Sequence, residues 1–156
     1  MPNMPTIVLL EPQIPPNTGN VARLCAATKT RLEIVGDIGF ELSDKTLKRA
    51  GLDYWPHVDW EHKPDLDAYM NEMAGKRVHL LTTKSNVPYW SRSFGPDDYL
   101  IFGRETTGIP EVYRTRFSES CCTIPMASPH VRSLNLSTAV GIVLYEAIRQ
   151  LQGGAR

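Results

Sequence analysis

Two kinds of hydrophobic pattern alternate along the chain. Short runs of consecutive apolar residues are typical of strands that are buried on both faces of a parallel sheet. Stretches of the second kind place apolar residues three and four positions apart, as a helix packed on a core requires. The first pattern predicts strands at residues 6–12, 31–36, 77–83, 98–103 and 119–125, with a short strand in "HVDWE" at residues 57–61.

The second pattern, combined with capping signals, predicts the helices. Ser43 suits the N-cap of one helix and Gly51 follows its last turn, while Pro64 opens another helix that Gly75 follows. Because strands and helices alternate throughout, we expect an α/β fold with a parallel sheet and helices on both faces. The predicted helices cover residues 17–28, 44–50, 64–73, 110–116 and 136–151.

Length and composition narrow the class of protein. The 156 residues suffice for one domain, without a repeat or linker, so we expect a single domain over residues 1–156 with a flexible tail at 152–156. The formal net charge is zero, so a polyanionic partner would have to be bound by a local basic patch. The three cysteines show no CxxC or ligand spacing, which predicts a reduced, cytoplasmic chain without structural metal. We expect no signal peptide and no membrane span.

Ligands of parallel sheets bind beyond the carboxyl ends of the strands. Three loops in such positions, at residues 12–20, 103–110 and 125–135, are rich in Gly, Pro, Asn and Ser. In the first, Asn17 to Asn20 fit a turn and a helix N-cap. Arg23 needs another explanation, because a cation gains nothing from the positive end of a helix. It is either an exposed solubilising residue or, on one helix face with Asn20, part of a site for an anion or developing oxyanion.

The other two loops carry weaker signals of the same kind. Gly103 allows a close approach to the backbone where a strand ends, and Glu105 places a carboxylate just beyond that end. Ser133, Asn135 or Ser137 can cap the last helix. One cap needs only one of these groups, so the others are candidates for binding a ligand.

The last predicted helix is apolar around much of its circumference. Such a helix is covered on more than one side, either by its own sheet or by a second subunit. In a chain this short, we favour a homodimer.

Five segments carry a resemblance to a known family. "PPNTGNVARLCAAT", "RAGLDYW", "LTTK", "FGRETTGIP" and "IPM…RSLNLSTAV…YEA" occur in that order over almost the full chain. In these motifs the sequence resembles the SpoU class of the SPOUT methyltransferases. It is most similar to the single-domain enzymes that methylate the 2′-hydroxyl of the wobble cytidine or uridine of tRNA. The second motif has Thr107 where the family often has a basic residue. The lack of G-x-G-x-G after the first strand disfavours a Rossmann-type methyltransferase.

The resemblance implies a C-terminal deep trefoil knot and an active site completed across a homodimer. It implies S-adenosylmethionine as the cofactor, S-adenosylhomocysteine as its product, and no metal. The partner would be the anticodon stem-loop of tRNA, with leucine isoacceptors as the expected substrates. The implied catalytic residues are Arg23, Asn20, Glu105 and Asn135. The implied cofactor pocket consists of Leu81, Thr82, Gly103, Ile124, Met126, Ser133, Leu134 and Asn135.

The family's usual mechanism makes the arginine at the position of Arg23 the general base. Arginine side chains stay protonated in proteins, so an electrostatic role is chemically easier. In that role the guanidinium holds the target phosphate or stabilises the developing alkoxide while another acceptor takes the proton. The sequence leaves both roles open.

Substrate binding in a neutral chain needs local charge. A solvated helix face explains the basic residues at positions 45, 48 and 49 equally well. Tyr145 either stacks on a flipped base or packs against the protein. The candidate substrate-binding residues are Lys45, Lys48, Arg49, Arg132 and Tyr145, with Arg104, Arg114 and Arg116 as further cations.

Two other functions compete with this interpretation. Methylation of ribosomal RNA fits the same chemistry, but the chain is short and carries no appended RNA-binding domain. A non-catalytic RNA- or nucleotide-binding α/β module fits the same fold. The presence of Arg23, Glu105, Ser133 and Asn135 together argues against a loss of catalysis.

Overall fold

The computed structural model describes residues 3–40 and 55–153. Within these residues, six strands form one parallel sheet in the order β3-β2-β1-β5-β4-β6. This confirms the parallel α/β sheet that the alternating patterns predict. The strands are β1 (Thr6–Leu10), β2 (Leu32–Val35), β3 (Trp60–Lys63), β4 (Val78–Leu81), β5 (Tyr99–Phe102) and β6 (Cys121–Cys122).

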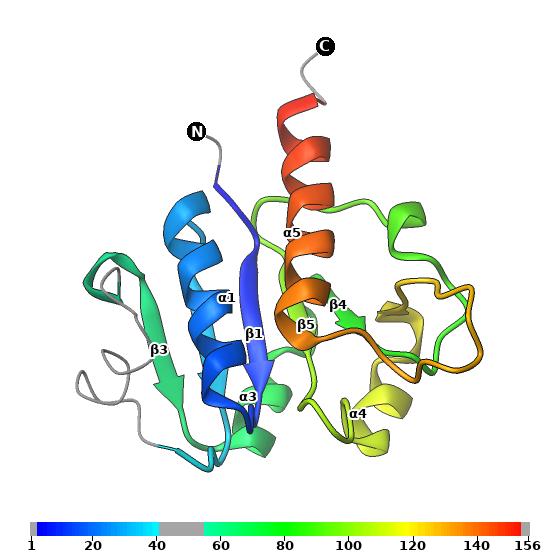
Figure 1. Cartoon of the computed structure of the whole chain (residues 1–156), viewed down its shortest axis with the longest axis horizontal. Helices are drawn as coiled ribbons and strands as arrows, with labels where there is room; N and C mark the ends of the chain where they lie inside the picture. The colour runs from blue at the N-terminus through cyan, green and yellow to red at the C-terminus, as the bar shows by residue number, and fades with distance from the viewer. Residues whose placement is uncertain (1–2, 41–54, 154–156) are drawn as a thin grey trace.

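Helices cover both faces of the sheet, as predicted. Ile7 and Leu9 of β1 face a core that α1 and α5 complete, whereas Val8 and Leu10 face a second core closed by α3 and α4. Figure 1 shows α1 and α5 side by side in front of the sheet. The helices are α1 (Pro15–Thr28), α3 (Leu66–Glu72), α4 (Glu111–Arg116) and α5 (Leu136–Gly153), with 3-10 helices η1 (Trp55–His57), η2 (Tyr89–Ser91) and η3 (Ser118–Ser120).

Two predicted elements begin later than expected. Strand β3 starts at Trp60, because residues 55–57 form η1 and Trp55 packs on Trp60 with ring centroids 4.8 Å apart. Helix α3 starts at Leu66, because Asp65 is its N-cap and accepts a hydrogen bond of 3.0 Å from the backbone N–H of Ala68. The predicted helix at residues 44–50 lies outside the described residues.

The C-terminal elements also differ in length. Strand β6 has two residues, not seven, because it pairs only with β4 and η3 precedes it directly. Helix α5 continues to Gly153, so residues 152 and 153 are helical rather than part of a flexible tail. None of the described helices combines the length and apolar character that a membrane span needs.

Candidate active site

The topology places a ligand site beside β1 and β5. From β1 the chain builds outward through β2 and β3 on one side, and β5, β4 and β6 lie on the other. Such a reversal of strand order opens a crevice at the carboxyl ends of the strands. A cavity of about 1000 Å³ starts at the loop after β1 and extends over the carboxyl ends of β5, β4 and β6, and its volume is in the size range of small-molecule sites.

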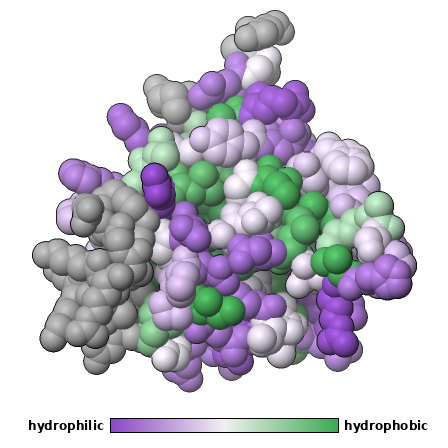
Figure 2. Space-filling view, viewed as in Figure 1, coloured by the Kyte–Doolittle hydropathy of each residue, from purple (hydrophilic) through white to green (hydrophobic). Residues whose placement is uncertain are grey.

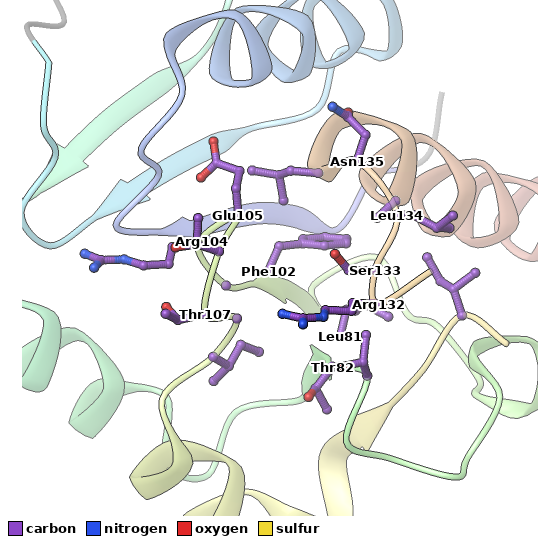
Figure 3. Close-up of a pocket in the computed structure, with 18 of the residues that line it drawn as sticks. Leu81, Thr82, Phe102, Arg104, Glu105, Thr107, Arg132, Ser133, Leu134 and Asn135 are labelled. Atoms are coloured by element: carbon purple, nitrogen blue, oxygen red, sulfur yellow. The ribbon is translucent and has the colours of Figure 1, made fainter. Parts of the chain in front are cut away.

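The three loops that sequence analysis singled out form the walls of this cavity (Figure 3). Leu81 and Thr82 lie at the end of β4, Gly103 follows β5, and the third loop crosses over them before α5 begins. Apolar walls come from Phe102, Ile109 and Leu136, among others. All of the predicted pocket residues line it: Leu81, Thr82, Gly103, Ile124, Met126, Ser133, Leu134 and Asn135.

The need for glycine at position 103 comes from the loop itself. A Cβ atom there would lie 2.1 Å from the backbone carbon of Gly108 and 2.2 Å from the backbone nitrogen of Ile109. The loop folds back in this way because the N–H of Gly108 donates to the carbonyl of Arg104 at 2.9 Å. The close approach that Gly103 was expected to allow is therefore made by the chain's own backbone.

Glu105 fastens this loop to the start of α1. Its Oε1 accepts from the backbone N–H of Gln13 at 2.9 Å, and its Oε2 accepts from the N–H of Ile14 at 2.8 Å. The donors are the N-cap residue Ile14 and the residue before it, at the N-terminal end of α1, where a negative charge is stabilised. The carboxylate thus caps a helix 92 residues away in sequence.

A chain of amides extends this contact to α5. Asn17 donates from Nδ2 to Glu105 Oε2 at 3.2 Å, and its Oδ1 accepts from Asn135 Nδ2 at 3.0 Å. The Oδ1 of Asn135 in turn accepts from the backbone N–H of Ser137 at 2.9 Å, so Asn135 is the residue that caps α5. The Glu105–Asn17–Asn135 network therefore ties all three motif loops together.

Asn17 has a role that its sequence pattern does not reveal. The pattern predicts a turn or N-cap at Asn17, but α1 begins at Pro15, with Ile14 as N-cap, and Asn17 is buried in the first turn. The adjacent prolines were the available signal, because proline favours the first helical position and so moves the helix start ahead of Asn17.

Glu105 and Asn135 direct their polar groups toward α1 in Figure 3. Their hydrogen bonds hold loops and helix ends, so the geometry gives both side chains a positioning role. Direct catalytic roles for the two residues stay a prediction.

The predicted basic residues are divided among different surroundings. Arg104, Arg114 and Arg132 line the cavity together with Lys84. Arg104 forms an ion pair of 3.4 Å with Glu11, and Arg116 donates to Asn71 Oδ1 on α3 at 2.9 Å. The predicted substrate residues Lys45, Lys48 and Arg49 lie outside the described residues.

Arg23 and Asn20 lie on one face of α1, as their three-residue spacing predicts, and both are exposed. Neither residue lines the cavity that its own chain forms. Tyr145 is 54% exposed on α5, so it does not pack in the core. Figure 2 shows the side of the molecule that α1 and α5 cover, and hydrophobic side chains gather in its middle, over α5 and the adjoining part of α1.

The cysteines do not supply a nucleophile to the cavity. Burial raises the pKa of the Cys25 thiol to about 12 and that of Cys122 to about 11. Both therefore stay protonated near neutral pH and behave as small apolar residues of the core.

Comparisons with known proteins identify the family. Residues 4–145 match the SpoU rRNA Methylase family. The tRNA (cytidine(34)-2′-O)-methyltransferase of Methylovorus glucosotrophus is 47% identical over 145 residues, which are 92% of this chain and 94% of the relative. The chain therefore belongs to the SpoU rRNA Methylase family.

Solved structures agree with this assignment. One, described as giving structural insights into the 2-OH methylation of C/U34 on tRNA, superposes with a TM-score of 0.89 at 45% identity, covering 98% of this chain and 99% of that one. An AdoMet-bound rRNA methyltransferase from Sinorhizobium meliloti superposes with a TM-score of 0.80 at 26% identity, covering 97% of this chain and 58% of that one.

The Glu105 contact yields a test of the site's architecture. We expect Glu105→Gln to lower the free energy of unfolding by about 1–2 kcal/mol, because an amide nitrogen would face backbone N–H donors that need an acceptor. Glu111→Gln, an exposed residue in the first turn of α4, is the matched control and should change stability by less than about 0.5 kcal/mol. Urea unfolding of both variants measures the difference. Equal free energies of unfolding for the Glu105→Gln and Glu111→Gln variants would show that the Glu105 carboxylate does not fasten the loop.

Proposed function

We propose that this chain transfers a methyl group from S-adenosylmethionine to the 2′-hydroxyl of the wobble nucleotide, cytidine or uridine 34, of tRNA. The observation that carries the proposal is the convergence of three motif loops on one cavity at the switch point of the sheet. Relatives that cover nearly the whole chain support the wobble position as the target.

The cavity suits the proposed cofactor. Its apolar side chains, among them Leu81, Phe102 and Ile124, suit an adenine ring, and its cations Lys84, Arg114 and Arg132 suit a carboxylate. When bound, S-adenosylmethionine supplies a methyl group on a sulfonium, which already has a good leaving group. The chain's task is then to exclude water, orient the ribose and help its hydroxyl lose a proton.

We propose that Arg23 and Asn20 serve the cavity of a partner subunit in a homodimer. Both lie on an exposed helix face and outside the cavity of their own chain. The hydrophobic side chains over α5 and α1 offer a surface for a second copy, and Tyr145 lies exposed on the same helix, α5. An isologous contact would present each Arg23 to the neighbouring site.

In such a site, Arg23 acts through charge and geometry. A guanidinium presents several donors in a fixed plane and binds a phosphate or a developing alkoxide through paired hydrogen bonds. The proton of the ribose hydroxyl then passes to another acceptor, such as water. This assignment avoids asking a permanently protonated group to act as a base.

Further parts of the proposal rest on the family resemblance. They are the deep trefoil knot in the C-terminal part, the single-domain organisation, the leucine isoacceptors as substrates and S-adenosylhomocysteine as the product. A cytoplasmic location is proposed because the cysteine pattern suits a reducing compartment.

Incubating the purified protein with methyl-labelled S-adenosylmethionine and bulk tRNA tests the function. We expect label in tRNA, and digestion to nucleosides should yield 2′-O-methylated cytidine or uridine from position 34. Label in ribosomal RNA alone would favour the alternative substrate. Tight tRNA binding without any transfer would favour the non-catalytic module.

A further inference from the structure

A second pocket lies where β4 begins, at the amino ends of the strands. We call this end of the sheet the amino edge. The volume of the pocket is about 360 Å³. It collects residues from the start of β4 and just before it, from the end of η2 and the two residues that follow, and from the residue before β6. Its lining consists of Lys76, Arg77, Val78, His79, Ser91, Arg92, Ser93 and Ser120.

The lining is cationic and rich in hydroxyl groups. Lys76, Arg77 and Arg92 supply three positive charges. Of these three, Arg77 contacts a carboxylate, that of the buried Asp98, whose oxygens interact with His79 Nε2 at 2.7 Å, the N–H of Gly95 at 2.8 Å and Arg77 Nε at 3.4 Å. The pocket therefore keeps a positive charge that a single carboxylate does not balance.

Arg92 is held in place by neutral groups. Its Nε donates to His79 Nδ1 at 3.1 Å, and its Nη1 donates to the carbonyl of Glu119 at 3.0 Å. Burial lowers the pKa of His79, so the imidazole is neutral and can accept from Arg92 while Nε2–H donates to Asp98. Within the described residues, these bonds engage Nε and Nη1, which leaves donors on Nη2 for a ligand.

Arg77 is oriented in a similar way. Its Nη2 donates to the carbonyl of Ser93 at 2.7 Å, yet its side chain is 63% exposed. A half-open pocket of this kind suits a phosphate group that is part of a larger molecule better than an anion enclosed by protein. Fixed guanidinium groups and hydroxyls are also the usual partners of nucleic-acid phosphates.

We propose that the pocket formed by Lys76, Arg77 and Arg92 at the amino edge of the sheet binds a backbone phosphate of the RNA substrate, outside the cofactor cavity. This inference rests on the proposed function for the identity of the ligand. Strand β4 spans four residues, so the two sites are separated by roughly 13 Å along the strand. One RNA can therefore engage both edges of the sheet.

Charge-removing variants test the inference by equilibrium binding of bulk tRNA. We expect Lys76→Gln with Arg77→Gln to weaken binding by roughly tenfold and to reduce the slope of log K against log salt by about 0.7 for each phosphate that the protein no longer neutralises. Lys29→Gln is the control, because Lys29 is an exposed cation near the same edge of the sheet, beside β2, and outside the pocket. The double variant removes two charges and the control removes one. If the change in log Kd for the double variant is no more than twice the change for the control, the inference is wrong.

Methylation kinetics separate this inference from the proposed function. We expect the double variant to raise KM for tRNA and to leave kcat unchanged, because the pocket lies away from the reacting atoms. Wild-type protein that binds tRNA without methylating it would contradict the proposed function, whereas the binding comparison would still decide the inference. A wild type that methylates, together with a double variant that binds like the control, would contradict the inference alone.

Inorganic phosphate distinguishes a free anion from an RNA phosphate. We expect phosphate to compete with tRNA for the wild type more strongly than chloride at equal ionic strength, and to lose that advantage in the double variant. A shift of the His79 ring resonances with phosphate, combined with unchanged tRNA binding by the double variant, would assign the pocket to a free phosphate and overturn the RNA assignment.

Discussion

Arg23→Lys is expected to reduce methyl transfer to tRNA by at least about a hundredfold while keeping the positive charge. The reason is geometric, since an ammonium cannot present the planar, paired donors of a guanidinium to a phosphate or alkoxide. Cofactor binding should stay unchanged, because the proposed contacts of Arg23 are with a phosphate or the developing alkoxide of the RNA and not with the cofactor. Single-turnover transfer and equilibrium binding of S-adenosylhomocysteine measure the two effects.

Arg149→Lys is the control for this substitution. Arg149 is an exposed arginine on α5 that pairs with Glu146 on the same helix, and its replacement should leave transfer near the wild-type rate. Near-normal turnover by Arg23→Lys would mean that a positive charge alone suffices. The claim that transfer needs the paired donors of a guanidinium would then be wrong.

Gly103→Ala is expected to abolish cofactor binding and to destabilise the fold by at least about 3 kcal/mol. The atoms that a new Cβ would strike belong to the backbone of residues 108 and 109, at 2.1 and 2.2 Å, so no side chain can rotate away. The loop would have to open, and with it the wall that carries Glu105. Titration with S-adenosylhomocysteine and urea unfolding measure both losses.

Gly39→Ala is the matched control, because a Cβ atom at Gly39 would meet nothing within 4 Å. It should bind the cofactor normally and unfold at the wild-type urea concentration. If Gly103→Ala also behaved in this way, the loop would not be closed as described.

Mixing the two variants tests whether Arg23 acts across subunits. A dimer of one Arg23→Lys chain and one Gly103→Ala chain has one intact cavity, and the only guanidinium at position 23 belongs to the other chain. Random mixing should restore about a quarter of wild-type activity if Arg23 serves its partner, since half of the dimers are mixed and each has one working site. No recovery, with mixed dimers present, would place Arg23 in the cavity of its own chain.

The sequence predicted the elements whose signals are local. Strands such as β1 and β5 are continuous apolar runs because helices cover both of their faces, and α5 is bounded by an Asn cap that the sequence offers among three candidates. The boundaries that failed depend on tertiary contacts. The start of β3, for example, follows from the packing of Trp55 on Trp60, and the length of β6 follows from its single neighbour.

The features of the site also divide into those that the sequence predicts and those that depend on tertiary contacts. The three loops could be predicted because parallel topology brings the carboxyl ends of strands together. The partners of Glu105 could not, because the residues concerned are separated by about 90 positions in the chain. The pocket at the amino edge could not be predicted for a similar reason, since Arg77 meets Asp98, and Arg92 meets His79, only once β4 is in place in the sheet.

Helix α1 contributes to both active sites of the proposed dimer. Its first turn is fastened by Glu105 to the wall of one cavity, and Arg23 follows Asn17 by six residues, or roughly 9 Å along the helix axis. A helix is stiff over that length, so α1 joins the wall of one cavity to the guanidinium that the same subunit would offer to its neighbour.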